Sequence, residues 1–197
     1  MPLSSPAQRE RARPLSPEDR REAILWAALP LIKKHGRDVS TRQIAEAAGV
    51  AEGTLFRAFG DKDTLLQSAV EKFFDPLPLI AALRALDPDL PLDAKLDGIL
   101  VHLRSRFTGI FEMMGALGLR SRPPVPTETA SLWIAALADV LAPHADELAV
   151  PVETVAYYLR LLAFASSFSG FNVVHEFSTD ELARLVTRGV ARRGEAA

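Results

Sequence analysis

The chain has 197 residues, of which 48% are hydrophobic and 24% are charged, a composition typical of one compact domain or two small ones. It contains no cysteine, which excludes disulfide scaffolds, cysteine nucleophiles and thiolate metal sites. The four histidines are far apart in the sequence, so we expect no metal site and no cofactor. A membrane span needs about 18 consecutive apolar residues, and a secretion signal needs an apolar core. Because the sequence shows neither, we expect a cytoplasmic protein with no membrane partner.

The net charge of −2 is unevenly distributed. Residues 1–60 hold ten Lys or Arg and seven Asp or Glu, whereas residues 61–197 hold thirteen and eighteen. A weakly basic N-terminal part is typical of a protein that binds phosphate groups through one small surface. Scattered surface charge explains the same numbers equally well, so charge alone does not identify the partner.

Residues 1–15 are polar and rich in proline and arginine, which predicts a flexible basic arm. Arg9, Arg11 and Arg13 can reach a DNA minor groove or the neighbouring backbone. A disordered tail that makes no fixed contact is the simpler interpretation of the same residues.

A first helix is predicted to begin at Ser16, whose hydroxyl can cap it, and to end near Gly36. Pro30 lies inside its apolar pattern and should bend the helix or destabilise it. A second helix should follow Ser40, which begins a capping box, and should end before Gly49. Further short helices are predicted over residues 53–59 and 62–74.

The remainder of the chain is also helical in pattern, and no segment has the alternation of a strand. Each expected helix has its own apolar side, so this part should form a core of its own. The helices are expected over residues 79–86, 92–107, 109–119, 127–142, 152–170 and 178–194. The sequence therefore predicts an all-α fold.

Residues 41–60 have the pattern of two short helices joined by a tight turn. Small or apolar residues occupy the positions where these helices face each other, and Gly49 lies at the turn, where a positive φ is easy only for glycine. This is the sequence form of a helix-turn-helix, whose second helix enters the DNA major groove. A plain helical hairpin produces a similar pattern and stays open at this point.

The stretch VSTRQIAEAAGVAEGTLFRAFGDKDTLL, residues 39–66, resembles the DNA-binding domain of the TetR family of bacterial transcriptional repressors. The matching residues are Thr41, Ile44-Ala45, Ala48-Gly49-Val50, Gly53-Thr54-Leu55, the aromatic Phe56, Phe59, Lys62 and Leu65. The resemblance covers roughly residues 18–75. It implies an N-terminal helix-turn-helix domain of three or four helices over residues 16–74, and a C-terminal helical bundle over residues 75–197 for ligand binding and dimerisation.

Three positions depart from the family pattern. The family usually has a small hydroxyl residue, a tyrosine and a histidine where this chain has Ala51, Phe56 and Ala58. Three polar contacts are therefore missing, and the family's DNA contacts do not transfer as a whole.

We predict DNA contacts for seven residues: Thr41, Arg42, Gly53, Thr54, Phe56, Arg57 and Lys62. The first two begin the second helix, where a hydroxyl, a guanidinium and free backbone amides can hold phosphate. Gly53 permits close backbone approach, and the threonine beside it can reach phosphate or a base edge. Arg57 can pair with guanine, and Phe56 can touch a thymine methyl group or a sugar. Lys62 resembles the phosphate-binding lysine of the family.

The alternatives at these positions are ordinary ones. Arg57 and Lys62 can be simple solvated charges, and Phe56 can pack between helices without touching DNA.

The helices expected over residues 127–142 and 152–170 are apolar on nearly all sides. Other apolar groups must therefore pack against each helix on more than one side. A second subunit provides such cover, and a twofold dimer presents two recognition helices to a near-palindromic site. Burial within one large monomer is the alternative. The predicted dimer contacts are Ala130, Leu137, Leu159, Ala163 and Ser167.

Aromatic and methionine side chains gather in the helices that would surround the middle of the rear domain. Such walls adapt to a flat or apolar small molecule, although plain core packing explains each residue separately. The predicted ligand-binding residues are Phe73, Phe107, Phe111, Met114, Trp133, Phe164 and Phe168.

The sequence thus predicts a one-component transcriptional regulator, a repressor that binds double-stranded operator DNA as a homodimer and is released by a small apolar or amphipathic effector. The alternative is the same DNA reader controlled by a protein partner, or one without any small-molecule effector. An enzyme is not expected, because the sequence offers no nucleophile–base pair, glycine-rich phosphate loop or metal cluster.

Overall fold

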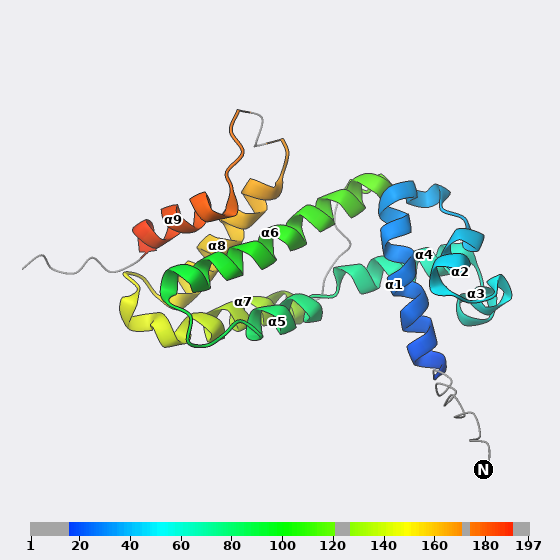
Figure 1. Cartoon of the computed structure of the whole chain (residues 1–197), viewed down its shortest axis with the longest axis horizontal. Coiled ribbons are helices and arrows are strands. Elements are labelled where there is room, and N and C mark those ends of the chain that lie inside the picture. Colours follow the sequence, from blue (N-terminus) through cyan, green and yellow to red (C-terminus); the bar gives the residue numbers. More distant parts are fainter. Residues whose placement is uncertain (1–15, 121–126, 171–173, 191–197) are drawn as a thin grey trace, which may run out of the picture.

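The computed structural model describes residues 16–120, 127–170 and 174–190, and no strand occurs within these ranges. The predicted all-α class is therefore confirmed (Figure 1). The helices, with two 3-10 segments labelled η, are α1 (Pro17–His35), η1 (Gly36–Asp38), α2 (Thr41–Ala48), α3 (Glu52–Phe59), α4 (Lys62–Phe74), α5 (Leu77–Arg84), α6 (Leu92–Leu117), α7 (Thr127–Leu141), η2 (Ala142–Glu147), α8 (Val152–Ser167) and α9 (Thr179–Val190).

Side-chain caps set the beginnings of several helices. The hydroxyl of Ser16 accepts a hydrogen bond from the backbone N–H of Asp19 at 3.0 Å, and Asp61 accepts one from Thr64 at 2.7 Å. Ser40 forms the full capping box that its sequence predicts, with bonds in both directions to the third residue of α2. Because each cap joins residues only three positions apart, sequence alone locates these helix starts.

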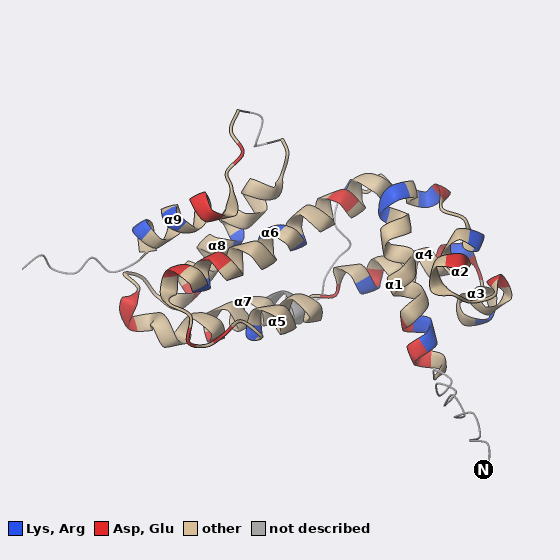
Figure 2. Cartoon of the chain, in the orientation of Figure 1, with Lys and Arg blue, Asp and Glu red and all other residues tan. Residues whose placement is uncertain are grey.

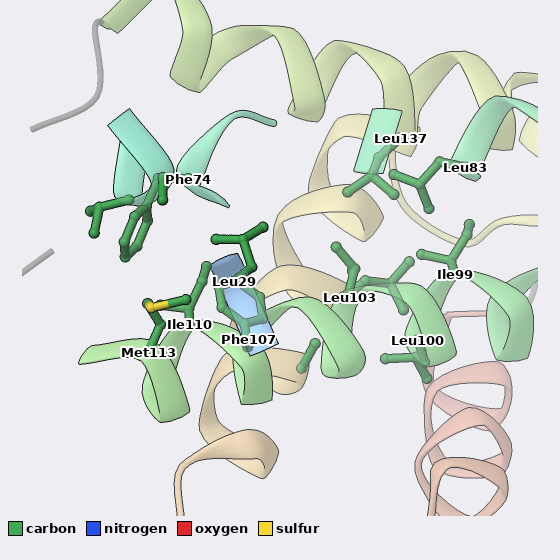
Figure 3. Close-up of a cluster of buried hydrophobic side chains, with 14 of the residues drawn as sticks. Leu29, Phe74, Leu83, Ile99, Leu100, Leu103, Phe107, Ile110, Met113 and Leu137 are labelled. Atoms are coloured by element: carbon green, nitrogen blue, oxygen red, sulfur yellow. The ribbon is translucent and has the colours of Figure 1, made fainter. Parts of the chain in front are cut away.

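Helices α1 to α4 lie together at one end of the molecule, and α5 to α9 form the other end (Figure 1). The long helix α6 reaches from the rear bundle to α1. The rear helices bury apolar side chains against one another, and these side chains continue into those of α1 to α4 as one contiguous cluster. In Figure 3, Leu29 of α1 lies beside Phe107 of α6, and Leu137 of α7 lies beside Leu83 of α5. A shift of α6 therefore displaces groups packed against α1.

The predicted break between residues 92–107 and 109–119 is wrong, because α6 continues without interruption from Leu92 to Leu117. Gly109 acts instead in tertiary packing. A Cβ atom on Gly109 would lie 3.2 Å from the Nζ of Lys33 and 3.3 Å from the ring of Phe73. The glycine thus permits close approach of α6 to α1 and α4, at a cost in helix propensity of about 1 kcal/mol.

Other boundaries moved by two or three residues. Helix α5 covers Leu77–Arg84 and includes Pro78 in its first turn, where a missing N–H costs little. Helix α8 ends at Ser167 rather than at residue 170. The predicted bounds of α1 are confirmed, because it begins after Ser16, continues through Pro30 and ends at His35. The expected arm over residues 1–15, most of the expected loop after α6 and the end of the last helix lie outside the described residues.

The described part of the chain offers neither a membrane-spanning helix nor a metal-binding cluster. None of its helices has the length and apolarity that crossing a membrane requires. The same residues contain no group of three or more His, Asp or Glu side chains placed to hold a metal ion.

Candidate nucleic-acid interface

Helices α2 and α3 are joined by a turn of three residues. Gly49 adopts the left-handed conformation, with φ of 66°, and ends α2. The N–H of the next residue, Val50, bonds to the carbonyl of Ala45 at 3.0 Å, which closes the turn. Ala45 is itself buried, so the two helices pack closely. The structure therefore contains the helix-turn-helix that the sequence predicts.

Helix α3 is buried on one side only. Leu55 and Phe59 point into the core and are 1% and 5% exposed. On the opposite side, Phe56 is 47% exposed and Arg57 and Gly53 are exposed. The alternative that Phe56 simply packs between helices is therefore wrong. An eight-residue helix anchored by one face presents its other face to a partner.

Arg57 lies back along its own helix. Its Nε donates to the carbonyl of Gly53 at 3.3 Å, and its Nη2 donates to the hydroxyl of Thr54 at 3.4 Å. Both bonds are long and therefore weak. The guanidinium is held over the exposed side of α3, yet it can leave these partners for a guanine base or a phosphate.

At the beginning of α2, the two predicted phosphate contacts already have acidic partners. The hydroxyl of Thr41 donates to the carboxylate of Glu52, and Arg42 forms an ion pair with Glu46 at 3.0 Å. A threonine hydroxyl has one proton, so Thr41 cannot donate to phosphate while it holds Glu52. The ion pair of Arg42 is exposed to solvent on both sides and contributes little, so Arg42 can change partner.

Sequence reasoning missed Glu52. Its position in the first turn of α3 was compatible with a simple favourable interaction with the helix dipole. Nothing local indicated that its carboxylate reaches across to Thr41 in α2, eleven residues earlier.

Lys62 lies at the beginning of α4, beside the end of α3. Its Nζ donates to the backbone carbonyl of Arg37 at 2.8 Å. An ammonium group has three donors, so two remain for a phosphate. Asp61 caps the same helix, and the hydrogen bond from the Thr64 amide holds the pKa of the Asp61 carboxyl below its ordinary value.

The helix-turn-helix part has no net charge: residues 16–74 contain nine Lys or Arg and nine Asp or Glu. Basic and acidic residues are both present along α1 to α4 (Figure 2). Attraction of an anionic partner to this part would thus depend on where the basic groups lie, not on an overall field. One place where they gather is a pocket of about 390 Å³ between the start of α1 and α3, lined by Pro17, Glu18, Arg20, Arg21, Thr54, Arg57 and Ala58.

Four of the predicted ligand-binding residues come together in the rear bundle. The ring centroid of Phe164 is 5.4 Å from that of Phe107 and 5.3 Å from that of Phe111, and Phe111 is 5.2 Å from Phe168. These four rings are called the aromatic group below. They join α6 to α8 and to the residue just after it.

The other three predicted ligand-binding residues have different surroundings. Phe73 packs edge-on to Phe74 and lies under the guanidinium of Arg106. Trp133 lies under the guanidinium of Arg160, at 4.8 Å from the ring centroid. Met114 is half-buried against the core.

The predicted dimer contacts mostly lie inside the single chain. Leu137, Leu159 and Ala163 are completely buried in it, so that prediction chose the wrong side of α7 and α8. Ser167 donates to the carbonyl of Arg104 at 3.3 Å, and the side chain of Ala130 lies outside the described residues. Because both helices are apolar nearly all round, periodicity does not tell which side faces the core. The large apolar side chains that α8 exposes are Tyr157, Tyr158, Leu161 and Phe164.

Comparison with known sequences places the helix-turn-helix in a family. Residues 24–69 match the sequence model described as "Bacterial regulatory proteins, tetR family". The HTH-type transcriptional repressor KstR of Rhodococcus jostii (strain RHA1) is 45% identical over 74 residues, which are 37% of this chain and 31% of that protein. The match thus spans about a third of the length of this curated relative.

Solved structures share the fold along most of the chain. The TetR transcriptional regulator SCO0520 of Streptomyces coelicolor has a TM-score of 0.61 and 24% identity, over 88% of this chain and 99% of that one. The fatty acid degradation regulator FadR of Bacillus halodurans has a TM-score of 0.54 and 17% identity, over 89% and 95% of the two chains. The helix-turn-helix region, residues 24–69, is thus similar to the TetR family of bacterial regulatory proteins, and the solved structures show a shared fold along most of the chain.

Proposed function

We propose that this protein is a homodimeric transcriptional repressor that binds a near-palindromic operator through α3 and is released by a small apolar or amphipathic ligand. The observation that carries the proposal is the two-sided character of α3. Leu55 and Phe59 fix one side in the core, while Gly53, Phe56 and Arg57 occupy the exposed side. Side chains in that arrangement reach base edges when the helix enters the major groove.

The residues around α3 supply contacts to the DNA backbone. Arg42 at the start of α2 and Lys62 at the start of α4 each keep donors that can turn to phosphate. Phosphate contacts set the register of a protein on DNA but do not read its sequence. We assign sequence reading to Arg57, Thr54 and Phe56, and positioning on the backbone to Arg42 and Lys62.

The dimer is supported by the exposed apolar side of α8. Tyr157, Leu161 and Phe164 are 54%, 57% and 44% exposed and lie within two turns of one helix. Exposed apolar side chains gathered on one helix mark an interaction surface. A second copy that packs its own α8 there covers both patches at once, as a twofold axis requires. The two α3 helices then read half-sites about one DNA turn apart, roughly 34 Å.

The effector is supported by the aromatic group. Four phenylalanine rings around the α6–α8 contact form an apolar, adaptable surface. One of them, Phe168, is 41% exposed and is not part of the α8 patch assigned above to the second copy. A ligand that binds these rings weakens DNA binding only if it has a higher affinity for a dimer conformation in which the two α3 helices no longer match the half-sites. The size of the effect is set by that difference in affinity. The repressor sign follows the name of KstR, which is 45% identical to this chain over 74 residues.

Selection from genome fragments tests the DNA-binding part of the proposal. Purified protein is incubated with sheared bacterial DNA, and the retained fragments are sequenced. The proposal predicts enrichment of fragments that share one near-palindromic motif. Retention of fragments without a shared motif would contradict it.

Thermal shift against a panel of metabolites tests the effector. A compound that binds the folded protein raises its melting temperature. The expected compounds are apolar or amphipathic and also lower the affinity for the selected operator. If no compound in the panel does both, control by a protein partner or the absence of any effector becomes the better account.

A further inference from the structure

Arg21 of α1 connects three structural elements through one guanidinium group. Its Nη1 donates to the backbone carbonyl of Ala58 in the last turn of α3. Its Nη2 donates to the hydroxyl of Ser68 in α4 at 3.1 Å. The guanidinium carbon also lies 4.0 Å from the ring centroid of Phe59, the last residue of α3.

Helix α3 needs such support because it is weak by itself. It is eight residues long, and its N-cap residue Ala51 provides no side-chain cap. A helix this short is not stable alone, and its last carbonyl groups lack partners within the helix. A cation at the C-terminal end stabilises both the free carbonyls and the helix dipole. Arg21 brings that cation from a different helix.

Both terminal nitrogens of Arg21 donate to protein groups, although the side chain also lines the pocket described above. The side chain is partly buried between α1, α3 and α4, whereas Arg42 and Arg57 are exposed. A planar guanidinium that binds a carbonyl and a hydroxyl and also stacks on a ring fixes their relative positions. Leu55 and Phe59 hold α3 onto the core, but apolar contacts alone permit it to tilt. The bonds from Arg21 oppose that tilt.

We propose that Arg21 is a positioning residue that sets the orientation of α3, so that specific DNA recognition depends on Arg21 although it does not contact the DNA. This inference rests on the proposed function. Without Arg21, the exposed side of α3 remains present but its base contacts are misaligned. Contacts to phosphate, which are tolerant of small displacements, remain.

The first test needs no DNA. Hydrogen exchange is measured for the amides of α2 and α3 in the wild-type chain, in Arg21→Met and in Ser68→Ala. Arg184→Met, on the remote helix α9, is the control for loss of an arginine charge. We expect faster exchange in α3 but not in α2 for Arg21→Met, a smaller change in the same direction for Ser68→Ala, and no change for the control. Equal exchange of α3 in the wild type and in both variants would overturn the inference.

The second test uses the selected operator and a scrambled duplex at several salt concentrations. We expect Arg21→Met to lower the affinity for the operator at least tenfold, while the affinity for the scrambled duplex and the salt dependence stay as in the wild type. Arg21→Lys keeps the positive charge but loses the planar, forked set of N–H donors of the guanidinium. Its operator affinity should lie between that of the wild type and that of Arg21→Met. A variant that is merely less folded would lose both affinities together.

Two results would overturn the positioning role in this second test. If Arg21→Met weakens operator and scrambled duplex equally and lowers the salt slope by about one unit, Arg21 contacts phosphate instead. If Arg21→Met binds the operator as tightly as the wild type does, the orientation of α3 does not depend on Arg21. Failure of the proposed function appears separately, as a wild-type protein that selects no operator, and the exchange test still decides on Arg21 in that case. Should Arg21→Met not fold, Ser68→Ala and Arg21→Lys carry both tests.

Discussion

Gly36, directly after α1, lies against the backbone of Ala116 near the end of α6: a Cβ atom on Gly36 would be 2.2 Å from the carbonyl oxygen of Ala116. Close by, Lys33 and Glu112 form an ion pair at 3.0 Å between the same two helices. This seam connects α6, which carries two rings of the aromatic group, to α1, which holds α3 through Arg21. Movement of α6 therefore has a direct mechanical route to the recognition helix.

The seam makes a sharp prediction for Gly36→Ala. The new methyl group meets a backbone oxygen, and the residue has a φ of 59° that alanine adopts poorly. We expect a loss of roughly 3 kcal/mol or more in the free energy of unfolding. Gly118→Ala is the control, because Gly118 has a φ of 64° and open space around it. That variant should lose only about 1–2 kcal/mol. Urea unfolding of the two variants checks the difference, and equal losses would mean that the contact with Ala116 is unimportant.

Arg57 and Lys62 should affect DNA binding in different ways. Arg57→Ala should cost about 1–3 kcal/mol of operator affinity and relax the preference for one base pair, if the guanidinium reads guanine. Lys62→Ala should weaken binding to all sequences alike and lower the salt slope by about one unit. Binding isotherms on the operator and a scrambled duplex measure both, with Arg184→Ala on α9 as the charge control. Unchanged affinity and base preference in Arg57→Ala would remove the reading role of Arg57.

The cap of α4 predicts a dependence of stability on pH. The amide of Thr64 lowers the pKa of Asp61 in the folded protein. A carboxyl with a lowered folded pKa stabilises the fold above its ordinary pKa, and this contribution is lost as pH falls through the lowered value. The stability difference between the wild type and Asp61→Ala should therefore be full at neutral pH and narrow on acidification. Unfolding at a series of pH values tests this. Asp63→Ala, in the same helical turn, controls for simple loss of charge. A difference in unfolding free energy between the wild type and Asp61→Ala that stays constant with pH would contradict the prediction.

The exposed side of α8 predicts the effect of a charge within the dimer contact. Leu161 is 57% exposed, and a lysine there would be buried without a partner when two copies pack. We expect Leu161→Lys to sediment as a monomer and to bind the operator more weakly. Val101→Lys on α6, where the native side chain is 47% exposed, should remain dimeric. A Leu161→Lys protein that sediments as the wild-type dimer would place the contact elsewhere.

The features that sequence located well are those set by near neighbours. Ser16, Ser40 and Asp61 cap their helices by bonds to residues three positions away, and Gly49 ends α2 through its own conformation. Even the exposed side of α3 follows from its spacing, because one apolar stripe on a short helix leaves one side free.

The features that sequence did not locate depend on partners distant along the chain. Separate helices were expected over residues 92–107 and 109–119, yet α6 is continuous, and Gly109 makes room for Lys33 and Phe73. Leu159 and Ala163 were expected at a dimer contact, yet a helix that is apolar all round does not indicate which neighbour covers which side. The bond of Thr41 to Glu52 joins two helices whose mutual angle the sequence does not give.

Site-specific photo-crosslinking shows whether the exposed side of α3 contacts operator bases. A photoreactive phenylalanine analogue replaces either Phe56 on α3 or Val101 on α6, native side chains that are both 47% exposed. With the selected operator bound, the account predicts crosslinks to DNA from position 56 and none from position 101. Two results would contradict contact between α3 and the operator bases. One is a bound operator that gives no crosslink from position 56, and the other is equal crosslinking from both positions.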